Sequence, residues 1–176
     1  SAAGMRYEAM RLDMVRPGII LYGQKPSPDC PDLPELRPVM ELKSTVAQVR
    51  ELREGETVGY GRHYTAPKSR RVATVTAGYA DGFLRGNAGG EVLICGRRAP
   101  ILGTICMDQL MADVTEIPEA APGCTATLFG RDGGLFLDAE EVAARMNTIS
   151  YEVLSGGGRR VPRFYRKDGA QSGSAN

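Results

Sequence analysis

Short apolar runs, each closed by a turn, follow one another through most of this chain and restrict what it can fold into. The runs are rich in Val, Ile and Thr and cover Val39–Leu52, Val72–Gly78, Val92–Cys95, Ala99–Cys106, Leu110–Val114 and Thr125–Phe129. Glycine, which enters tight turns most readily, accounts for 22 of the 176 residues. We therefore predict a mostly β fold, a barrel-like antiparallel sheet that hides its edges, with one or two short helices.

A proline-rich segment separates this β-rich body from the first residues. Five prolines lie between residues 25 and 38, which excludes a helix or a central strand there. We predict a domain boundary near residue 25. It leaves a short stub over residues 1–24, a β-rich domain over 25–168, and a polar, disordered tail over 169–176.

One segment, Leu137–Met146, has the pattern of a helix instead. Asp138 stands at the N-cap position and Glu141 follows three residues later, which is the arrangement of a capping box. Val142 and Met146 are spaced to share one apolar face. We predict a short helix that packs on the sheet and carries no chemistry.

Charge and cysteine usage exclude several classes of function. Lys and Arg number 22 against 21 Asp and Glu, and this balance argues against general electrostatic binding of nucleic acid. The apolar runs are too short to span a bilayer, and no secretion signal is visible. The four cysteines and single histidine lack zinc-ligand spacing, so we expect no metal site. Reduced thiols in a cytoplasmic protein are favoured over disulfides.

Several residues could carry chemistry, although spacing alone favours simpler roles. Tyr60 stands between two glycines and Tyr79 directly follows one, which is typical of turn residues. A tyrosine acts as an acid or base when nearby cations lower its pKa from about 10. Cys106, at a strand end, would need His63 as its base to act as a nucleophile. Arg160 and the arginine three residues later could bind an anion, but surface arginines are mostly solvated.

Six motifs together carry a resemblance: MVRPGIILYG, VGYGRHYTA, VTAGYADGFLR, PILGTICMDQLMADV, TISYEV and RVPRFYR. In this order and spacing, across residues 12–166, they resemble the C-terminal half of alanine racemases. In that family an N-terminal (β/α) barrel holds pyridoxal 5′-phosphate, and a β-rich C-terminal domain closes the site of the partner subunit. The resemblance implies that Leu12–Tyr22 is the last barrel strand. The family's cofactor lysine, in a motif of the type Lys-x-Asn-Ala-Tyr-Gly-His-Gly, has no counterpart in this chain.

The resemblance implies roles for residues at the substrate. Tyr60 matches the family's catalytic tyrosine, the base that acts on the L enantiomer. Met107 matches the residue whose backbone N–H binds the substrate carboxylate. Tyr79 and Tyr151 match aromatic residues that line the pocket.

A second set of positions matches the family's cofactor site. Arg16 matches the arginine that faces the pyridine nitrogen, where it disfavours protonation of that nitrogen and restrains side reactions. Gly18 and Ile19 match backbone donors to the cofactor phosphate. Tyr151 also lies near that phosphate in the family.

The access corridor and the overall function complete what the resemblance implies. Arg85 and Asp108 match the corridor, and Thr104 stands where many relatives carry arginine. We expect interconversion of L- and D-alanine in a cytoplasmic homodimer, with the chain's own barrel domain as partner, supplying D-alanine for peptidoglycan. Some relatives carry a membrane domain. The fragment alone is expected to be inactive. The alternatives are a serine or broad-specificity racemase on the same fold, and a stand-alone, non-catalytic dimerisation or binding module.

Overall fold

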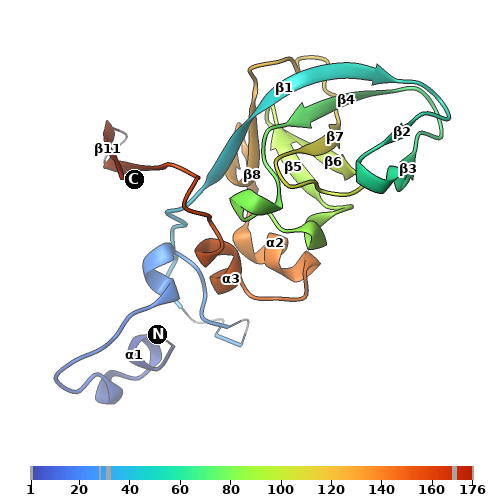
Figure 1. Ribbon diagram of the computed structural model, residues 1–176. Helices are drawn as coiled ribbons and strands as arrows, with labels where there is room; N and C mark the ends of the chain where they lie inside the picture. The colour runs from blue at the N-terminus through green and yellow to red at the C-terminus, as the bar shows by residue number, and fades with distance from the viewer. Residues whose placement is uncertain (1, 28, 31–32, 168–169, 176) are drawn as a thin grey trace.

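A closed ring of antiparallel strands forms the body of the computed structural model, which describes residues 2–27, 29–30, 33–167 and 170–175, with side chains through Arg166 (Figure 1). In the order in which they pair within this described part, the ring strands are β1 (Leu42–Leu52), β4 (Arg70–Val75), β7 (Leu110–Asp113), β6 (Arg97–Leu102), β5 (Glu91–Ile94) and β8 (Thr125–Asp132). Strand β1 closes the ring because its first residues pair with β8 and the remainder with β4. The predicted mostly β, barrel-like fold is confirmed.

Further strands lie outside the ring, and among those described only β9 pairs with a ring strand. A hairpin of β2 (Thr57–Val58) and β3 (Tyr64–Thr65) follows β1, and β9 (Leu135–Leu137) pairs with β8. Strand β10 (Arg163–Lys167) pairs with β11 (Ala170–Ala175). This differs from the predicted disordered tail at 169–176, of which Gly169 and Asn176 lie outside the described residues. Strand pairing uses backbone N–H and C=O groups, which a polar segment also supplies.

Apolar side chains fill the ring. One buried residue from each ring strand illustrates this: Val46, Val75, Leu110, Ile101, Leu93 and Leu128. Two helices, α2 (Ala139–Arg145) and α3 (Ser150–Ser155), cover one end of the ring and join the same core (Figure 1). Each fully buried Leu, Ile or Val side chain stabilises the fold by about 1.5–3 kcal/mol.

Helix α2 begins as predicted but is capped differently. The Asp138 carboxylate accepts a hydrogen bond from the backbone N–H of Glu140 at 3.2 Å, so Asp138 is the N-cap. Glu141, predicted to complete a capping box, turns its carboxylate toward Arg98 and Arg145 instead. Two guanidinium groups are stronger partners for a carboxylate than one backbone N–H, so Glu141 binds the arginines and does not complete the capping box.

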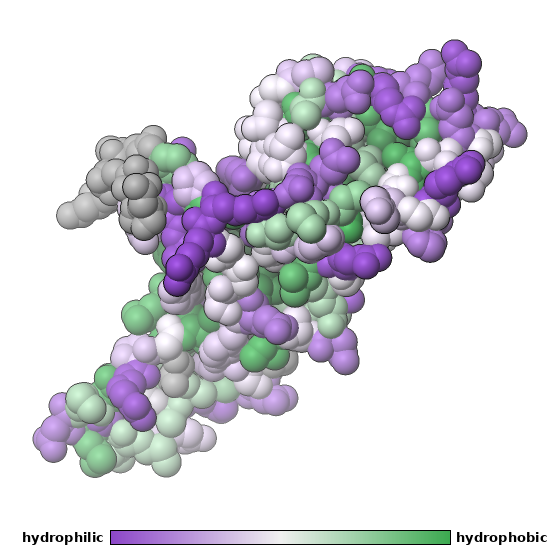
Figure 2. Space-filling model, viewed as in Figure 1, coloured by the Kyte–Doolittle hydropathy of each residue, from purple (hydrophilic) through white to green (hydrophobic). Residues whose placement is uncertain are grey.

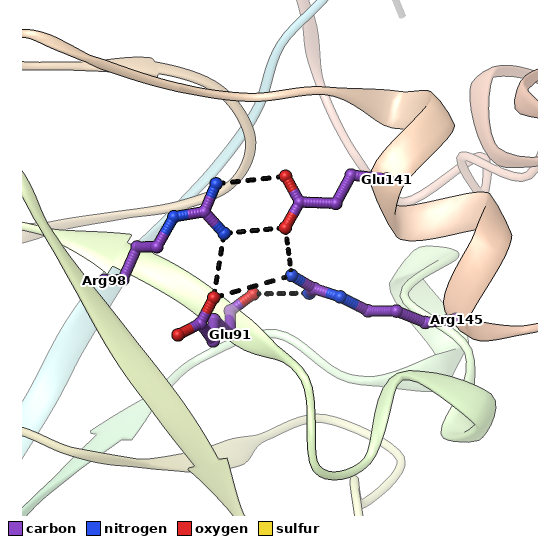
Figure 3. Close-up of polar contacts among 4 residues, drawn as sticks. All are labelled: Glu91, Arg98, Glu141 and Arg145. Carbon is purple, nitrogen blue, oxygen red and sulfur yellow. Dashed lines mark hydrogen bonds and ion pairs between the residues drawn. The ribbon is translucent and has the colours of Figure 1, made fainter.

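An ion-pair network fastens α2 to the β5–β6 hairpin (Figure 3). Arg98 donates to both carboxylate oxygens of Glu141, at 2.6 and 3.0 Å, and to Glu91 at 2.8 Å. Arg145 donates to Glu141 at 2.6 Å and to the backbone oxygen of Glu91 at 3.0 Å. The hydrogen bond from Arg98 is the largest cause that lowers the pKa of Glu141. The helix that covers the ring is therefore held by charge as well as by apolar packing.

The first residues stand away from the ring. They form α1 (Ala2–Arg6) and the 3₁₀ turns η1 (Glu8–Met10) and η2 (Ile19–Tyr22). Ile19 alone is buried among residues 2–22, whereas Leu12 and Met14 are 87% and 76% exposed. Figure 2 shows green, apolar surface among polar residues on this extension.

The expected barrel strand over Leu12–Tyr22 is absent from the described structure, where loop and η2 take its place. A parallel barrel strand needs hydrogen-bonded neighbours on both edges, and no described strand is placed to supply them. The predicted boundary near residue 25 stays a prediction; residues 33–41 contain neither helix nor strand.

Candidate active site

Tyr60 lies at the tip of the β2–β3 hairpin, in the 3₁₀ turn η3 (Tyr60–Arg62). Its neighbours Gly59 and Gly61 have φ of 85° and 79°, a left-handed conformation that side chains rarely adopt. The two glycines turn the chain sharply, and the Tyr60 side chain is left 83% exposed. The hairpin is anchored below by Val58, which is buried in a small apolar cluster with Leu102 and others.

The same hairpin lies against the segment that follows β6. A Cβ atom added to Gly103 would lie 2.9 Å from the Val58 carbonyl oxygen, and one added to Gly59 would lie 3.2 Å from the Thr104 nitrogen. The two backbones therefore pack with little space between them. This packing brings Tyr60 beside the loop that contains Met107.

A second loop, after β4, is joined to the Met107 loop through the backbone. Tyr79 N–H donates to the Cys106 oxygen at 3.1 Å, and Ala80 N–H donates to the Met107 oxygen at 3.0 Å. Gly78 makes this approach possible, because a Cβ atom there would lie 2.2 Å from the Cys106 oxygen. The two loops form a single backbone platform.

Five of the sequence-predicted residues line one hollow of about 600 Å³ on this platform. They are Tyr60, Tyr79, Arg85, Met107 and Asp108, and Thr104 lies in the same lining. The backbone N–H of Met107 has no hydrogen-bond partner among the described residues, and its side chain is half exposed. The hollow therefore combines a phenol, a guanidinium group and an available backbone donor, which suits a small anionic ligand.

Arg160, near the C-terminal end of the chain, binds both the loop after β4 and the loop that contains Met107. Its guanidinium donates to the Asp81 carboxylate at 2.8 Å and to the Asp108 carboxylate at 2.5 Å. The Asp81 carboxylate also accepts from Gly78 N–H at 2.9 Å. Hydrogen bonds to Asp81 and then Asp108 raise the pKa of Arg160. Sequence reasoning missed this role, since nothing in the sequence links residues 79 positions apart.

The alternative roles weighed from the sequence find little support in the geometry. Two carboxylates neutralise Arg160, so it is not an open anion site. No hydrogen bond joins Cys106 to His63 in the part of the chain that is described; the Cys106 thiol instead donates to the Thr104 oxygen at 3.8 Å. Within the described residues, no group of three or more His, Cys, Asp or Glu is placed to hold a metal ion.

The residues matched to the cofactor lie elsewhere. Gly18 precedes η2, and Ile19 is buried in the core cluster that includes Val153 of α3. Tyr151, in the first turn of α3, is 41% exposed. None of these, nor the exposed Arg16, lines the hollow that contains Tyr60. The structure therefore brings the substrate and corridor residues together, Tyr151 excepted, and leaves the residues matched to the cofactor outside the hollow.

Comparison with known proteins decides the family. The profile of the alanine racemase C-terminal domain matches residues 39–165. The chain belongs to the alanine racemase family. It is 49% identical over 166 residues to the alanine racemase of Desulfovibrio desulfuricans, covering 94% of this chain and 44% of that protein. Alanine racemase 1 of Bacillus subtilis is 44% identical over 172 residues, with coverage of 97% and 44%.

A solved alanine racemase shares the same structure. The alanine racemase from Bacillus anthracis with bound L-Ala-P superposes with a TM-score of 0.94 at 38% identity, covering 100% of this chain and 46% of that one. The chain thus spans less than half the length of the alanine racemases that it matches, and corresponds to their C-terminal domain. None of the helices in the described part of the chain has the length and apolar character needed to cross a membrane.

Proposed function

We propose that this chain is the C-terminal part of a pyridoxal phosphate-dependent alanine racemase, and that Tyr60 transfers the α-proton on the L face of alanine. The observation that carries the proposal is the placement of Tyr60: an 83% exposed phenol at a glycine-held tip, on the rim of a hollow with Met107 and Arg85. A buried phenol could not reach a substrate, whereas this one is presented outward. The Bacillus anthracis relative with bound L-Ala-P supports an alanine-like substrate.

Each residue of the platform has a definite task in this proposal. Racemisation needs a proton to leave one face of the α-carbon and return on the other, so two acid–base groups are required. Tyr60 serves the L face through its phenolic oxygen, and a lysine outside this chain serves the D face. The Met107 N–H donates to the substrate carboxylate and fixes which bond faces Tyr60. Arg160 holds the loops through Asp81 and Asp108.

The cofactor group fits pyridoxal phosphate by its donor chemistry. Gly18, directly before η2, and Ile19, its first residue, match the family's positions at the cofactor phosphate, Tyr151 adds a phenol, and Arg16 adds a cation for the pyridine nitrogen. Pyridoxal phosphate, when bound, supplies the electron sink for the carbanion at the α-carbon.

The absence of the cofactor-matched residues from the hollow of Tyr60 supports a homodimer. The hollow contains Tyr60 but none of the four cofactor residues. We infer that each Tyr60 acts on substrate at the cofactor of the partner subunit, and that the exposed apolar side chains of the N-terminal extension pack on the barrel of the intact protein. The intact enzyme would be cytoplasmic and supply D-alanine for peptidoglycan.

The test is isotope exchange in the intact protein carrying Tyr60→Phe. The phenyl ring is kept and the oxygen is lost, so we expect α-proton exchange from L-alanine to fall by about 10²–10⁴-fold, while D-alanine still exchanges. The control is Tyr64→Phe, on the same hairpin but packed in the small apolar cluster outside the hollow. Exchange from L-alanine at near the wild-type rate in Tyr60→Phe would refute the role of Tyr60.

A further inference from the structure

Two free cysteines meet on the face of the ring where β5 and β8 lie side by side. The sulfur atoms of Cys95 and Cys124 are 3.8 Å apart, although the residues are separated by 29 positions. Neither lines the hollow that contains Tyr60. The pair therefore has no part in the proposed racemase chemistry.

Both cysteines are held in place by the strands. Pairing of Ile94 with Ala126 fixes the end of β5 against the start of β8, next to Cys95 and Cys124 respectively. Cys95 turns the chain with φ of 51° at the hairpin that leads into β6. The Gly96 N–H donates to the Asp132 carboxylate at 3.0 Å, which ties this turn to β8. The short distance between the sulfurs is thus a product of strand register.

We propose that Cys95 and Cys124 form a thiol modification site, which a small disulfide compound converts to an intrachain disulfide. A thiolate of the pair attacks the reagent, forms a mixed disulfide and releases one reagent thiol. The second cysteine then attacks the mixed disulfide and releases the other reagent thiol. Two protein thiols are oxidised while one reagent disulfide is reduced to two thiols. A disulfide needs its sulfurs about 2.05 Å apart, so the side chains must approach by roughly 1.8 Å.

Local electrostatics select the reagent. Burial, the contact with Cys124, and the carboxylates of Asp132 and Glu119 raise the pKa of Cys95 to about 11. The Cys95 thiolate is therefore scarce at neutral pH, and attack by Cys95 accelerates as pH rises toward that value. The same carboxylates repel an anionic reagent and attract a cationic one. Cystamine, a cationic disulfide, is expected to react faster than oxidised glutathione, which is anionic.

The test treats the reduced intact protein with cystamine or oxidised glutathione and then maps its peptides without reduction. Trypsin leaves Cys106 and Cys124 in one peptide, so a second cleavage at methionine, using Met107 and Met111, separates them. We expect a loss of about 2 Da per chain and a peptide that links Cys95 to Cys124. Cys124→Ser should abolish this link, whereas the matched control Cys106→Ser should keep it.

Three outcomes would overturn the proposal. The first is a mass gain from separate reagent adducts on Cys95 and Cys124 with no cross-linked peptide. The second is a cross-link that joins a different pair of cysteines in the folded protein. The third is a wild-type chain in which both thiols stay alkylatable after prolonged treatment at alkaline pH. A faster reaction with oxidised glutathione than with cystamine would refute the selection by charge.

Discussion

Gly78→Ala tests whether the backbone platform under the hollow depends on close packing. Gly78 has extended backbone dihedrals, φ −149° and ψ −160°, so alanine meets no conformational strain there. Its added methyl group would lie 2.2 Å from the Cys106 oxygen and 2.4 Å from the Met107 oxygen. Both are backbone atoms, which cannot rotate away as the end of a flexible side chain can. The two loops must therefore separate by about 1 Å.

The magnitude follows from what that separation breaks. Overpacking costs about 1–3 kcal/mol. Weakening the hydrogen bonds from Tyr79 to Cys106 and from Ala80 to Met107 adds about 1 kcal/mol each. We expect the free energy of unfolding to fall by about 3–5 kcal/mol, which lowers Tm by roughly 6–20 °C in a chain of this size.

Thermal and urea unfolding of the chain measure this loss against a matched control. Gly134→Ala introduces the same methyl group in the β8–β9 turn, where no atom lies within 4 Å of it and no positive φ is imposed. Its Tm should stay close to that of the wild type. Equal unfolding free energies for the two variants, within about 0.5 kcal/mol, would refute the close-packing argument.

Three other substitutions address the helix network, the core and the substrate. Glu141→Gln should cost about 1 kcal/mol, because the carboxylate is partly solvent-screened. Arg98 lowers the pKa of Glu141, so the ionised carboxylate stabilises the fold fully above its ordinary pKa of 4.5. This stabilisation disappears as pH falls through the lowered pKa. The unfolding free energy of Glu141→Gln should therefore depend less steeply on pH in the acid range. Leu93→Ala should cost about 2–5 kcal/mol in urea unfolding, because Leu93 is fully buried. Tyr151→Asn in the intact protein should raise the serine-to-alanine ratio of kcat/KM on the order of tenfold; an unchanged ratio at cofactor saturation would place Tyr151 away from the substrate.

The candidate site could be read only in part from the sequence. The glycines around Tyr60 and before Tyr79 marked both as turn residues, because a turn is a local property of a few dihedral angles. Whether Tyr60 and Tyr79 share a hollow depends on how two loops pack. The ion pair between Arg160 and Asp81 depends on the path of the chain between them, and no local pattern encodes it.

The fold divides in the same way. Strand-forming runs and turn glycines determined the β-rich class and the positions of the ring strands, since strand propensity and turn formation act over neighbouring residues. The N-cap at Asp138 is also a local feature, and the sequence pattern predicted it correctly. The partners of Glu141 could not be predicted from local sequence. Its carboxylate can bind either a nearby backbone N–H or two arginines, and only tertiary structure brings those arginines close. The same holds for Leu12–Tyr22: its apolar residues were visible in sequence, but a barrel strand forms only where neighbouring strands supply hydrogen bonds. Closure of the ring, the hollow and the contact between Cys95 and Cys124 were likewise decided by tertiary structure, because each depends on residues that meet only after the strands pair.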